Sequence, residues 1–189
     1  MAAYSQLNGI VLGVAILSTG LVAQAPKYGV GRAASAEEVR AADISVSPDG
    51  ANLPPGGGTA AEGAAVYERR CQRCHGAKGE GGEEGPAVVG GQGTLNTAKP
   101  LKTVGSYWPY ATTIFDYTRR AMPFNQPGML TDHQVYAVTA RMLYLNGIIR
   151  ADERMDAKSL PKVKMPNRDG FIPDDRPDTG KGAKKATKK

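Results

Sequence analysis

Apolar residues recur with helical spacing in three stretches of the chain, and they predict three helices. The first helix spans Ala60 to Arg70, and its apolar face continues past its end: Gly63, Tyr67, Cys71 and Cys74. The second stripe consists of Tyr110, Ile114, Tyr117 and Ala121. The third consists of Val135, Val138, Met142 and Leu145, and it stops before Gly147. We expect the last helix to cross the first near Gly63, where the missing side chain allows a close approach.

Start and stop signals bound these helices. Thr131 to Gln134 has the form of a capping box, and so does Ser35 to Glu38, which predicts an additional short helix. Pro109 is suited to the first turn of the second helix. Met122 precedes Pro123, and the residue before a proline is pushed out of the α region. The second helix should therefore end at Met122.

The rest of the chain lacks this periodicity and is rich in glycine and proline, with 24 and 13 among 189 residues. Pro54 to Gly58 is a linker. We therefore expect an N-terminal extension and linker over residues 26–59 and a compact all-α domain over residues 60–147. Four prolines and scattered charges over residues 148–189 predict an extended arm with a lysine-rich tail. In this arm Met155 and Met165 lie among polar residues.

Residues 1–25 contain no charged side chain. An apolar run from Ile10 to Leu17 followed by Ala23 to Ala25 is typical of a signal peptide and its cleavage site. This pattern predicts export to the periplasm. A retained membrane anchor is the alternative, and the protein is expected at a membrane only in that case.

The net charge of +6 gives little information about partners. Five of the positive charges lie in the terminal lysine block, and without them the balance falls from +6 to +1. Such a block at a chain end is usually solvated. We therefore do not expect a nucleic-acid partner.

The residues with the most specific chemistry are Cys71-Gln72-Arg73-Cys74-His75. This C-x-x-C-H run is the attachment signature of a c-type haem. The two thiols can form thioethers with the haem vinyl groups, and His75 then becomes the proximal iron ligand. A redox dithiol and half of a zinc site are the alternatives, but no βαβ pattern surrounds the motif and only His133 could add a further ligand. The chain has one such motif, so one covalent haem c is predicted.

Two further positions are candidates for the haem site. Pro86 lies in a glycine-dense loop, at the place where a backbone carbonyl accepts the N–H of the proximal imidazole in proteins with this motif, although it could simply stiffen a turn. Met122, at a chain break, is the candidate sixth ligand, so the predicted metal ligands are His75 and Met122. The rivals are Met129 and His133.

Tyr107, Trp108 and Tyr110 form an aromatic cluster before the second helix. We expect them to line the haem edge, where an aromatic N–H or O–H finds an acceptor. Plain core packing is the alternative. The set of predicted cofactor-binding residues is Cys71, Cys74, His75, Met122, Pro86, Tyr107, Trp108 and Tyr110, and no catalytic residue is predicted.

With these motifs in this order, residues 60 to 147 resemble a class I c-type cytochrome. The resemblance implies an all-α fold around one covalent haem, with His and Met ligands and, in this chain, extended N- and C-terminal arms. This sequence departs from the family at Arg141, where an aromatic residue is common.

A narrower resemblance extends into the arms. Three segments are similar to the cytochrome subunit of the Sox sulfane dehydrogenase: Tyr28 to Arg32, Thr103 to Tyr110, and Leu160 to Phe171. In that family a molybdenum-cofactor subunit related to sulfite oxidases oxidises sulfur and passes electrons to the cytochrome. The resemblance implies such a subunit as the partner here, in a sulfane or sulfite dehydrogenase. It also favours a docking role for the arm from Met155 to Asp178, for which a disordered tail is the alternative.

The function expected from the sequence is electron transfer from that partner to a soluble or membrane-bound acceptor, without catalysis by this chain alone. The alternative is a haem enzyme with an exchangeable distal ligand, such as a peroxidase or a thiosulfate-oxidising cytochrome. That alternative requires Met122 to be absent from the iron.

Overall fold

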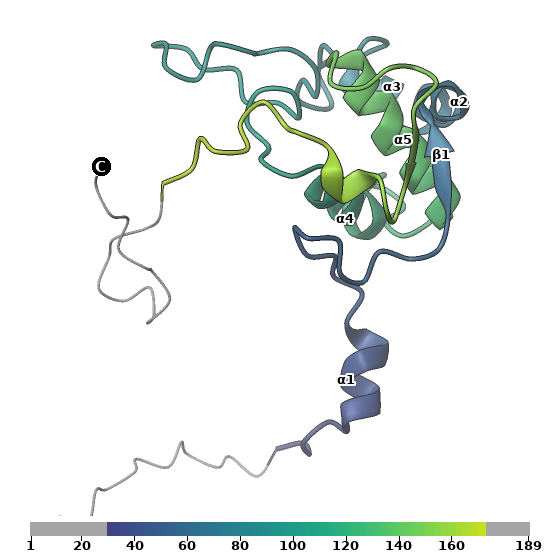
Figure 1. Ribbon diagram of the computed structural model, residues 1–189. Coiled ribbons are helices and arrows are strands. Elements are labelled where there is room, and N and C mark those ends of the chain that lie inside the picture. Colours follow the sequence, from purple (N-terminus) through teal and green to yellow (C-terminus); the bar gives the residue numbers. More distant parts are fainter. Residues whose placement is uncertain (1–29, 173–189) are drawn as a thin grey trace, which may run out of the picture.

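The structure is a computed structural model that describes residues 30–172 (Figure 1). The expected signal peptide and the lysine-rich tail lie outside the described residues. The elements are mainly helical: α1 Ala36–Ala42, β1 Gly57–Thr59, α2 Ala60–Arg70, α3 Gln72–His75, α4 Ala111–Ala121, α5 Asp132–Leu145, β2 Arg154–Asp156 and a 3₁₀ helix, Leu160–Lys162. No helix between residues 30 and 172 has the length and apolar character needed to span a bilayer.

Capping boxes start three of the helices. Ser35 caps α1 and Thr131 caps α5, each through a reciprocal bond with the third helical residue, as the sequence predicts. Thr59 caps α2 in the same way with Glu62, a capping box that the sequence analysis missed. The predicted span of the first helix, Ala60 to Arg70, is confirmed.

Helices α2 and α5 cross where Gly63 faces Ala137. A side chain at Gly63 would overlap the backbone carbonyl of Ala137 and the side chain of Arg141. The predicted close crossing at Gly63 is therefore confirmed. Gly147, with a φ of 68°, follows the end of α5 in the left-handed conformation that favours glycine.

Helix α4 differs from the prediction at its start and on one face. It begins at Ala111 with Tyr110 as its N-cap, so Pro109 lies before the helix and not in its first turn. The predicted stripe is only partly buried, because Ile114 is 2% exposed whereas Tyr117 is 47% exposed. Phe115, which follows Ile114 directly and is not part of the predicted stripe, packs on Tyr136 of α5 with 4.4 Å between ring centroids. The end of the helix is as predicted, since Met122 follows it in an extended conformation.

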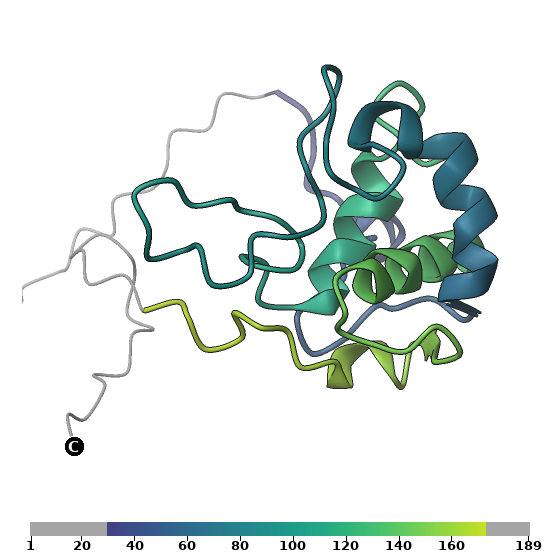
Figure 2. The same cartoon turned by 90° about the horizontal axis from the view of Figure 1, so that it is seen from above.

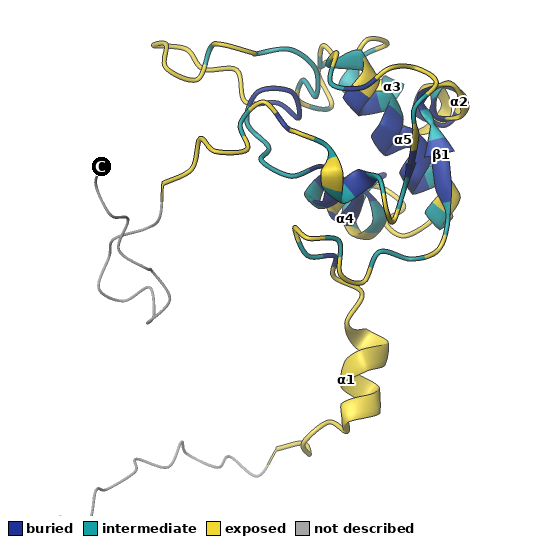
Figure 3. Ribbon diagram, in the orientation of Figure 1, coloured by how far each residue is buried: buried dark blue, intermediate teal, exposed yellow. Residues whose placement is uncertain are grey.

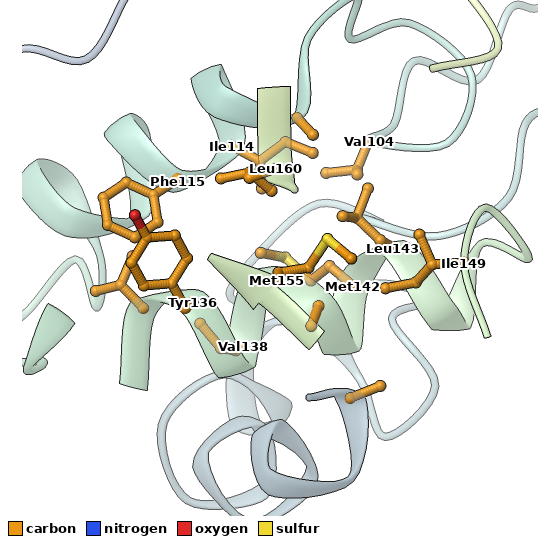
Figure 4. Close-up of a cluster of buried hydrophobic side chains, with 14 of the residues drawn as sticks. Val104, Ile114, Phe115, Tyr136, Val138, Met142, Leu143, Ile149, Met155 and Leu160 are labelled. Atoms are coloured by element: carbon orange, nitrogen blue, oxygen red, sulfur yellow. The ribbon is translucent and has the colours of Figure 1, made fainter. Parts of the chain in front are cut away.

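The segment after α5 is part of the core, which corrects the expectation that Met155 and Met165 lie in a polar tail. Strand β2 pairs antiparallel with β1, with Met155 opposite Gly58. Met155, Leu160 and Met165 are 3%, 0% and 3% exposed. Figure 4 shows Met155 and Leu160 among side chains from α4 and α5, and Figure 2 shows the segment returning beneath these helices. The first half of the arm is therefore folded onto the domain by burial of these side chains, whereas docking by the arm from Met155 to Asp178 stays a prediction.

The N-terminal segment has two parts. Helix α1 buries none of its side chains and projects away from the helices (Figure 3). After it the chain returns to the domain, where Val46 is buried. The carbonyl oxygen of Pro48 accepts a hydrogen bond from Thr112 in α4, at 3.1 Å.

Candidate haem-binding site

The two thiols and the imidazole of the C-x-x-C-H run lie on one helical turn directly after α2. Cys71 ends α2 and is also the N-cap of α3. Its carbonyl oxygen accepts hydrogen bonds from the backbone N–H groups of Cys74 at 3.1 Å and His75 at 2.9 Å. Gly76, with a φ of 81°, ends the turn. The three side chains needed for attachment and proximal ligation therefore come from one short, hydrogen-bonded element.

The imidazole of His75 is oriented by the following loop. Its Nδ1 lies 2.7 Å from the carbonyl oxygen of Pro86, as the sequence analysis expects for this loop. A carbonyl oxygen can only accept, so Nδ1 carries the proton and the lone pair is on Nε2. A neutral imidazole with a free Nε2 lone pair is a metal ligand.

The loop that carries Pro86 is held by its own backbone. Gly81 donates to the carbonyl oxygen of His75 at 2.8 Å. Val88 and Val89 both donate to the carbonyl oxygen of Gly79, at 2.9 and 3.0 Å. These backbone bonds help to place the Pro86 carbonyl beside the imidazole.

The thiols are not activated for redox exchange. Burial, followed by the neighbouring Cys74, raises the pKa of Cys71 to about 11. The pKa of Cys74 is raised as well, first by burial and then by its hydrogen bond with Glu84, with Sγ and Oε2 3.5 Å apart. Redox-active C-x-x-C motifs have a lowered thiol pKa. The redox-dithiol alternative therefore has no electrostatic support here.

A zinc site has no support within the described part of the chain. No group of three or more His, Cys, Asp or Glu side chains gathers there with metal-binding geometry. His133, the further ligand considered in the sequence analysis, is exposed and its Nδ1 lies 3.0 Å from the carbonyl oxygen of Gly57. It is therefore engaged with β1.

Among the methionines, Met122 has the position that best fits a ligand. Its side chain is half-buried at the end of α4, and its peptide bond to Pro123 is cis. Met142, Met155 and Met165 are buried in the hydrophobic core, and Met129 lies in an exposed stretch. Between residues 30 and 172, Met122 is thus the methionine that is neither buried in the core nor solvent-facing.

The three aromatic residues before α4 have different neighbours. Trp108 packs edge-on against Tyr117, with 5.8 Å between ring centroids. Tyr107 contacts Phe171 in the same manner at 5.2 Å, and the guanidinium of Arg168 lies 4.3 Å from the ring centroid of Tyr110. Tyr107 and Tyr110 are therefore in contact with the C-terminal segment. Their expected place at the haem edge stays a prediction, as does that of Trp108.

The sequence analysis places Tyr67 on the apolar face of the first helix, but it does not predict the hydrogen bond that Tyr67 forms here, and it does not single out Asn146. The hydroxyl of Tyr67, which is buried, donates to the carbonyl oxygen of Gly76 at 3.0 Å and so ties α2 to the end of the C-x-x-C-H turn. Asn146 donates to the carbonyl oxygen of Val88 at 3.1 Å and accepts from the N–H of Gly90 at 3.0 Å. Asn146 therefore joins the loop beyond Pro86 to the end of α5. Its place before Gly147 predicts a helix end and nothing more.

Comparison with known proteins agrees with this geometry. Residues 60–146 match the family model described as cytochrome c. The chain is 44% identical to a chain of the sulfane dehydrogenase SoxCD from Paracoccus pantotrophus, with a TM-score of 0.72. The match covers 81% of this chain and 75% of that one. The chain belongs to the cytochrome c family. No curated protein sequence matches it.

This cytochrome c binds one covalent haem c, and the predicted class I fold is confirmed. The residues present fit the group, because Cys71 and Cys74 supply two thiols on one turn and His75 offers a correctly protonated imidazole. The cytochrome acts in electron transfer. Met122 as the second axial ligand remains a prediction.

Proposed function

We propose that this cytochrome is an exported subunit that accepts electrons from a molybdenum-cofactor protein related to sulfite oxidases and passes them to a soluble or membrane-bound acceptor. The partner would oxidise a sulfane or sulfite substrate. The observation that carries the proposal is the extent of the likeness to the SoxCD chain. It covers 81% of this chain, which is more than the cytochrome domain of residues 60–146 can supply. The likeness therefore extends into segments outside the domain.

The C-terminal segment adds a structural reason. Asn167 donates to the carbonyl oxygen of Tyr107 at 2.8 Å, and Arg168 and Phe171 contact Tyr110 and Tyr107. These residues lie in two of the segments that resemble the Sox cytochrome subunit. The contacts bring two Sox-like segments into one surface, which is the arrangement expected if both serve the same complex.

In the proposed role the chain holds its cofactor rigidly. When bound, a haem with His and Met ligands takes up and releases one electron at a raised potential. Cys71 and Cys74 would anchor the group, and the Pro86 carbonyl would keep the His75 ring from turning and increase its basicity. Met122 would supply the second iron ligand. A site whose ligands do not rearrange suits electron transfer better than substrate turnover.

Export is part of the proposal. The uncharged stretch of residues 1–25 and its apolar run support it, and covalent haem is attached outside the cytoplasmic membrane. N-terminal sequencing of the mature holoprotein tests this step. A new N-terminus near Pro26 is expected, whereas an intact Met1 in a membrane fraction would indicate an anchor.

The partner is tested with an affinity-tagged full-length chain expressed together with the molybdenum-cofactor protein encoded beside it. The tagged cytochrome should co-purify with molybdenum, and its haem should be reduced when a sulfane or sulfite substrate is added. The same chain expressed alone is the control and should stay oxidised. If the two proteins do not associate and the haem stays oxidised in the mixture, the proposed partner is wrong.

A further inference from the structure

The last turn of α4 is joined to two distant segments through Arg119. Its Nε donates to Oδ1 of Asp132, in the first turn of α5, at 2.9 Å. Its Nη1 donates to the carbonyl oxygen of Ile44, in the N-terminal segment, at 3.3 Å. One guanidinium therefore holds three segments together.

The chain between these two helices begins with Met122 and ends at the cap of α5. Pro123 and Leu130 are buried, but residues 124–129 are exposed, and Phe124 is 86% exposed. Within this loop, the backbone N–H of Gln126 donates to the carbonyl oxygen of Pro123 at 2.9 Å, and that of Met129 donates to the carbonyl oxygen of Gln126 at 3.4 Å. A loop with so little packing of its own takes its shape from its two ends. The Arg119–Asp132 pair joins those ends directly.

This ion pair is better shielded from water than a typical surface pair. The side chains of Arg119 and Asp132 are 24% and 35% exposed, whereas those of Arg150 and Asp152 are 76% and 74% exposed. Partial burial strengthens a charge-assisted hydrogen bond because water competes less with it. The pair can therefore resist opening of the loop.

We infer that Arg119, with Asp132, is a positioning residue for Met122. The pair fixes the distance between the end of α4 and the start of α5, and so would hold the Met122 thioether where it can bind the iron. The inference rests on the proposed ligation by Met122. Weakening the pair should let an outside ligand replace Met122 more easily, while the attachment at Cys71 and Cys74 is unaffected.

The test is imidazole binding to the ferric holoprotein in three variants: Arg119→Gln, Asp132→Asn and the double variant. Each should bind imidazole about two- to fivefold more tightly than the wild type, the range that follows from the measured strength of partly exposed ion pairs. Because both residues act through one pair, the double variant should bind no more tightly than the single ones. Summed effects would mean that the two residues act independently, and the inference would be wrong.

Arg120→Gln is the matched control. Arg120 is the neighbouring arginine on α4, and it pairs with Asp116 of the same helix, so it does not link the ends of the loop. It should bind imidazole as the wild type does. A merely structural role for Arg119 would lower the melting temperature of its variants without changing their imidazole affinity, so both quantities are measured.

Met122→Ala distinguishes ligation by Met122 from the positioning of Met122 by Arg119 and Asp132. If it binds imidazole far more tightly than the wild type while the Arg119 and Asp132 variants do not, Met122 is the ligand and only the positioning role fails. If Met122→Ala binds imidazole as the wild type does, Met122 is not the ligand and the positioning role fails with it.

Discussion

The imidazole Nδ1 of His75 lies 2.7 Å from the carbonyl oxygen of Pro86, eleven residues further along the chain. No side chain other than the imidazole takes part, so this contact depends on the backbone path of the loop. That path turns through several glycines with positive φ, including Gly79 at 80° and Gly90 at 92°. The properties of the proximal ligand can therefore be altered by changing loop residues that touch neither the iron nor His75.

Gly79→Ala should raise the reduction potential of the haem. A Cβ at Gly79 would overlap Val89 and displace the loop, which would lengthen the bond to His75 and make the imidazole a weaker electron donor. Gly90→Ala is the control, because Gly90 has a similar φ but nothing within 4 Å of an added Cβ. Redox titration of both holoproteins is the measurement. Equal potentials in the two variants would argue against control by the loop.

Met122→Ala should open the sixth coordination position. We expect loss of the methionine-to-iron charge-transfer band, a lower potential and tight cyanide binding, because a low-spin haem with a fixed Met ligand resists exchange. Met129→Ala is the control, since Met129 lies in the same loop but is solvent-exposed. If the band is lost in Met129→Ala instead, the ligand assignment moves there. A wild type without the band would favour a haem enzyme with an exchangeable distal side.

Leu160→Ala should destabilise the domain by about 2–5 kcal/mol, the usual cost of truncating a buried Leu. Leu160 is fully buried against α4 and α5, although it lies beyond the last long helix. Chemical denaturation of the holoprotein is the measurement. Ile172→Ala, at a position that is 90% exposed, should leave the stability unchanged. A small effect of Leu160→Ala would mean that this segment is not part of the cooperative unit.

Truncation after Pro166 tests the part of the arm that remains available for docking. It keeps the buried side chains of Met155, Leu160 and Met165 and removes the residues that contact Tyr107 and Tyr110. The haem spectrum should survive, whereas affinity for the molybdenum-cofactor partner should fall. Truncation after Arg150 is less suitable, because it also removes β2 and core side chains. Unchanged partner affinity after truncation at Pro166 would exclude docking by residues 167–189.

The folded protein should lose stability in acid through Asp116. Burial by itself raises the pKa of this carboxyl, but hydrogen bonds from Arg120 and from the N–H of Val46 outweigh burial and hold the pKa below its usual value. A lowered pKa in the folded state contributes stability above the unfolded pKa, about 4, and this stability is lost as the pH falls through the folded value.

Melting temperatures measured from pH 6 to pH 3 give the test for Asp116. The Asp116→Asn variant should be less stable than the wild type at pH 6 and should lose less of its stability on acidification. Asp152→Asn is the control, because Asp152 forms a fully exposed pair with Arg150 that solvent screens. Parallel curves for the wild type and Asp116→Asn would show that Asp116 does not carry the pH dependence.

Local signals predicted most of the helices and the proximal half of the site. Ala60 to Arg70, the caps at Ser35 and Thr131, and the crossing at Gly63 follow from spacing and capping chemistry that neighbouring residues determine. The bond between His75 and the loop carbonyl could be expected because proteins with the C-x-x-C-H motif have such a carbonyl at this place in the following loop.

The C-terminal segment could not be predicted in this way. Met155, Leu160 and Met165 are separated by polar residues, and periodicity within a short window assigns such positions to the surface. Their burial depends on β1 and α4, which lie far away in the sequence. The prediction for Tyr117 was wrong in the opposite sense: periodicity places it on the same stripe as the buried Ile114, yet its side chain is exposed.

The pairing of β1 with β2 also affects the order in which the domain can assemble. Gly58 precedes the haem-binding residues in the sequence and Met155 follows them, so the pairing of these two residues closes the chain around that region. Contacts of such long sequence separation form slowly because the intervening chain must first be ordered. The core therefore stays incomplete until the residues up to Met165 have joined it. Under the proposed export, haem attachment at the C-x-x-C-H turn can precede this closure of the chain.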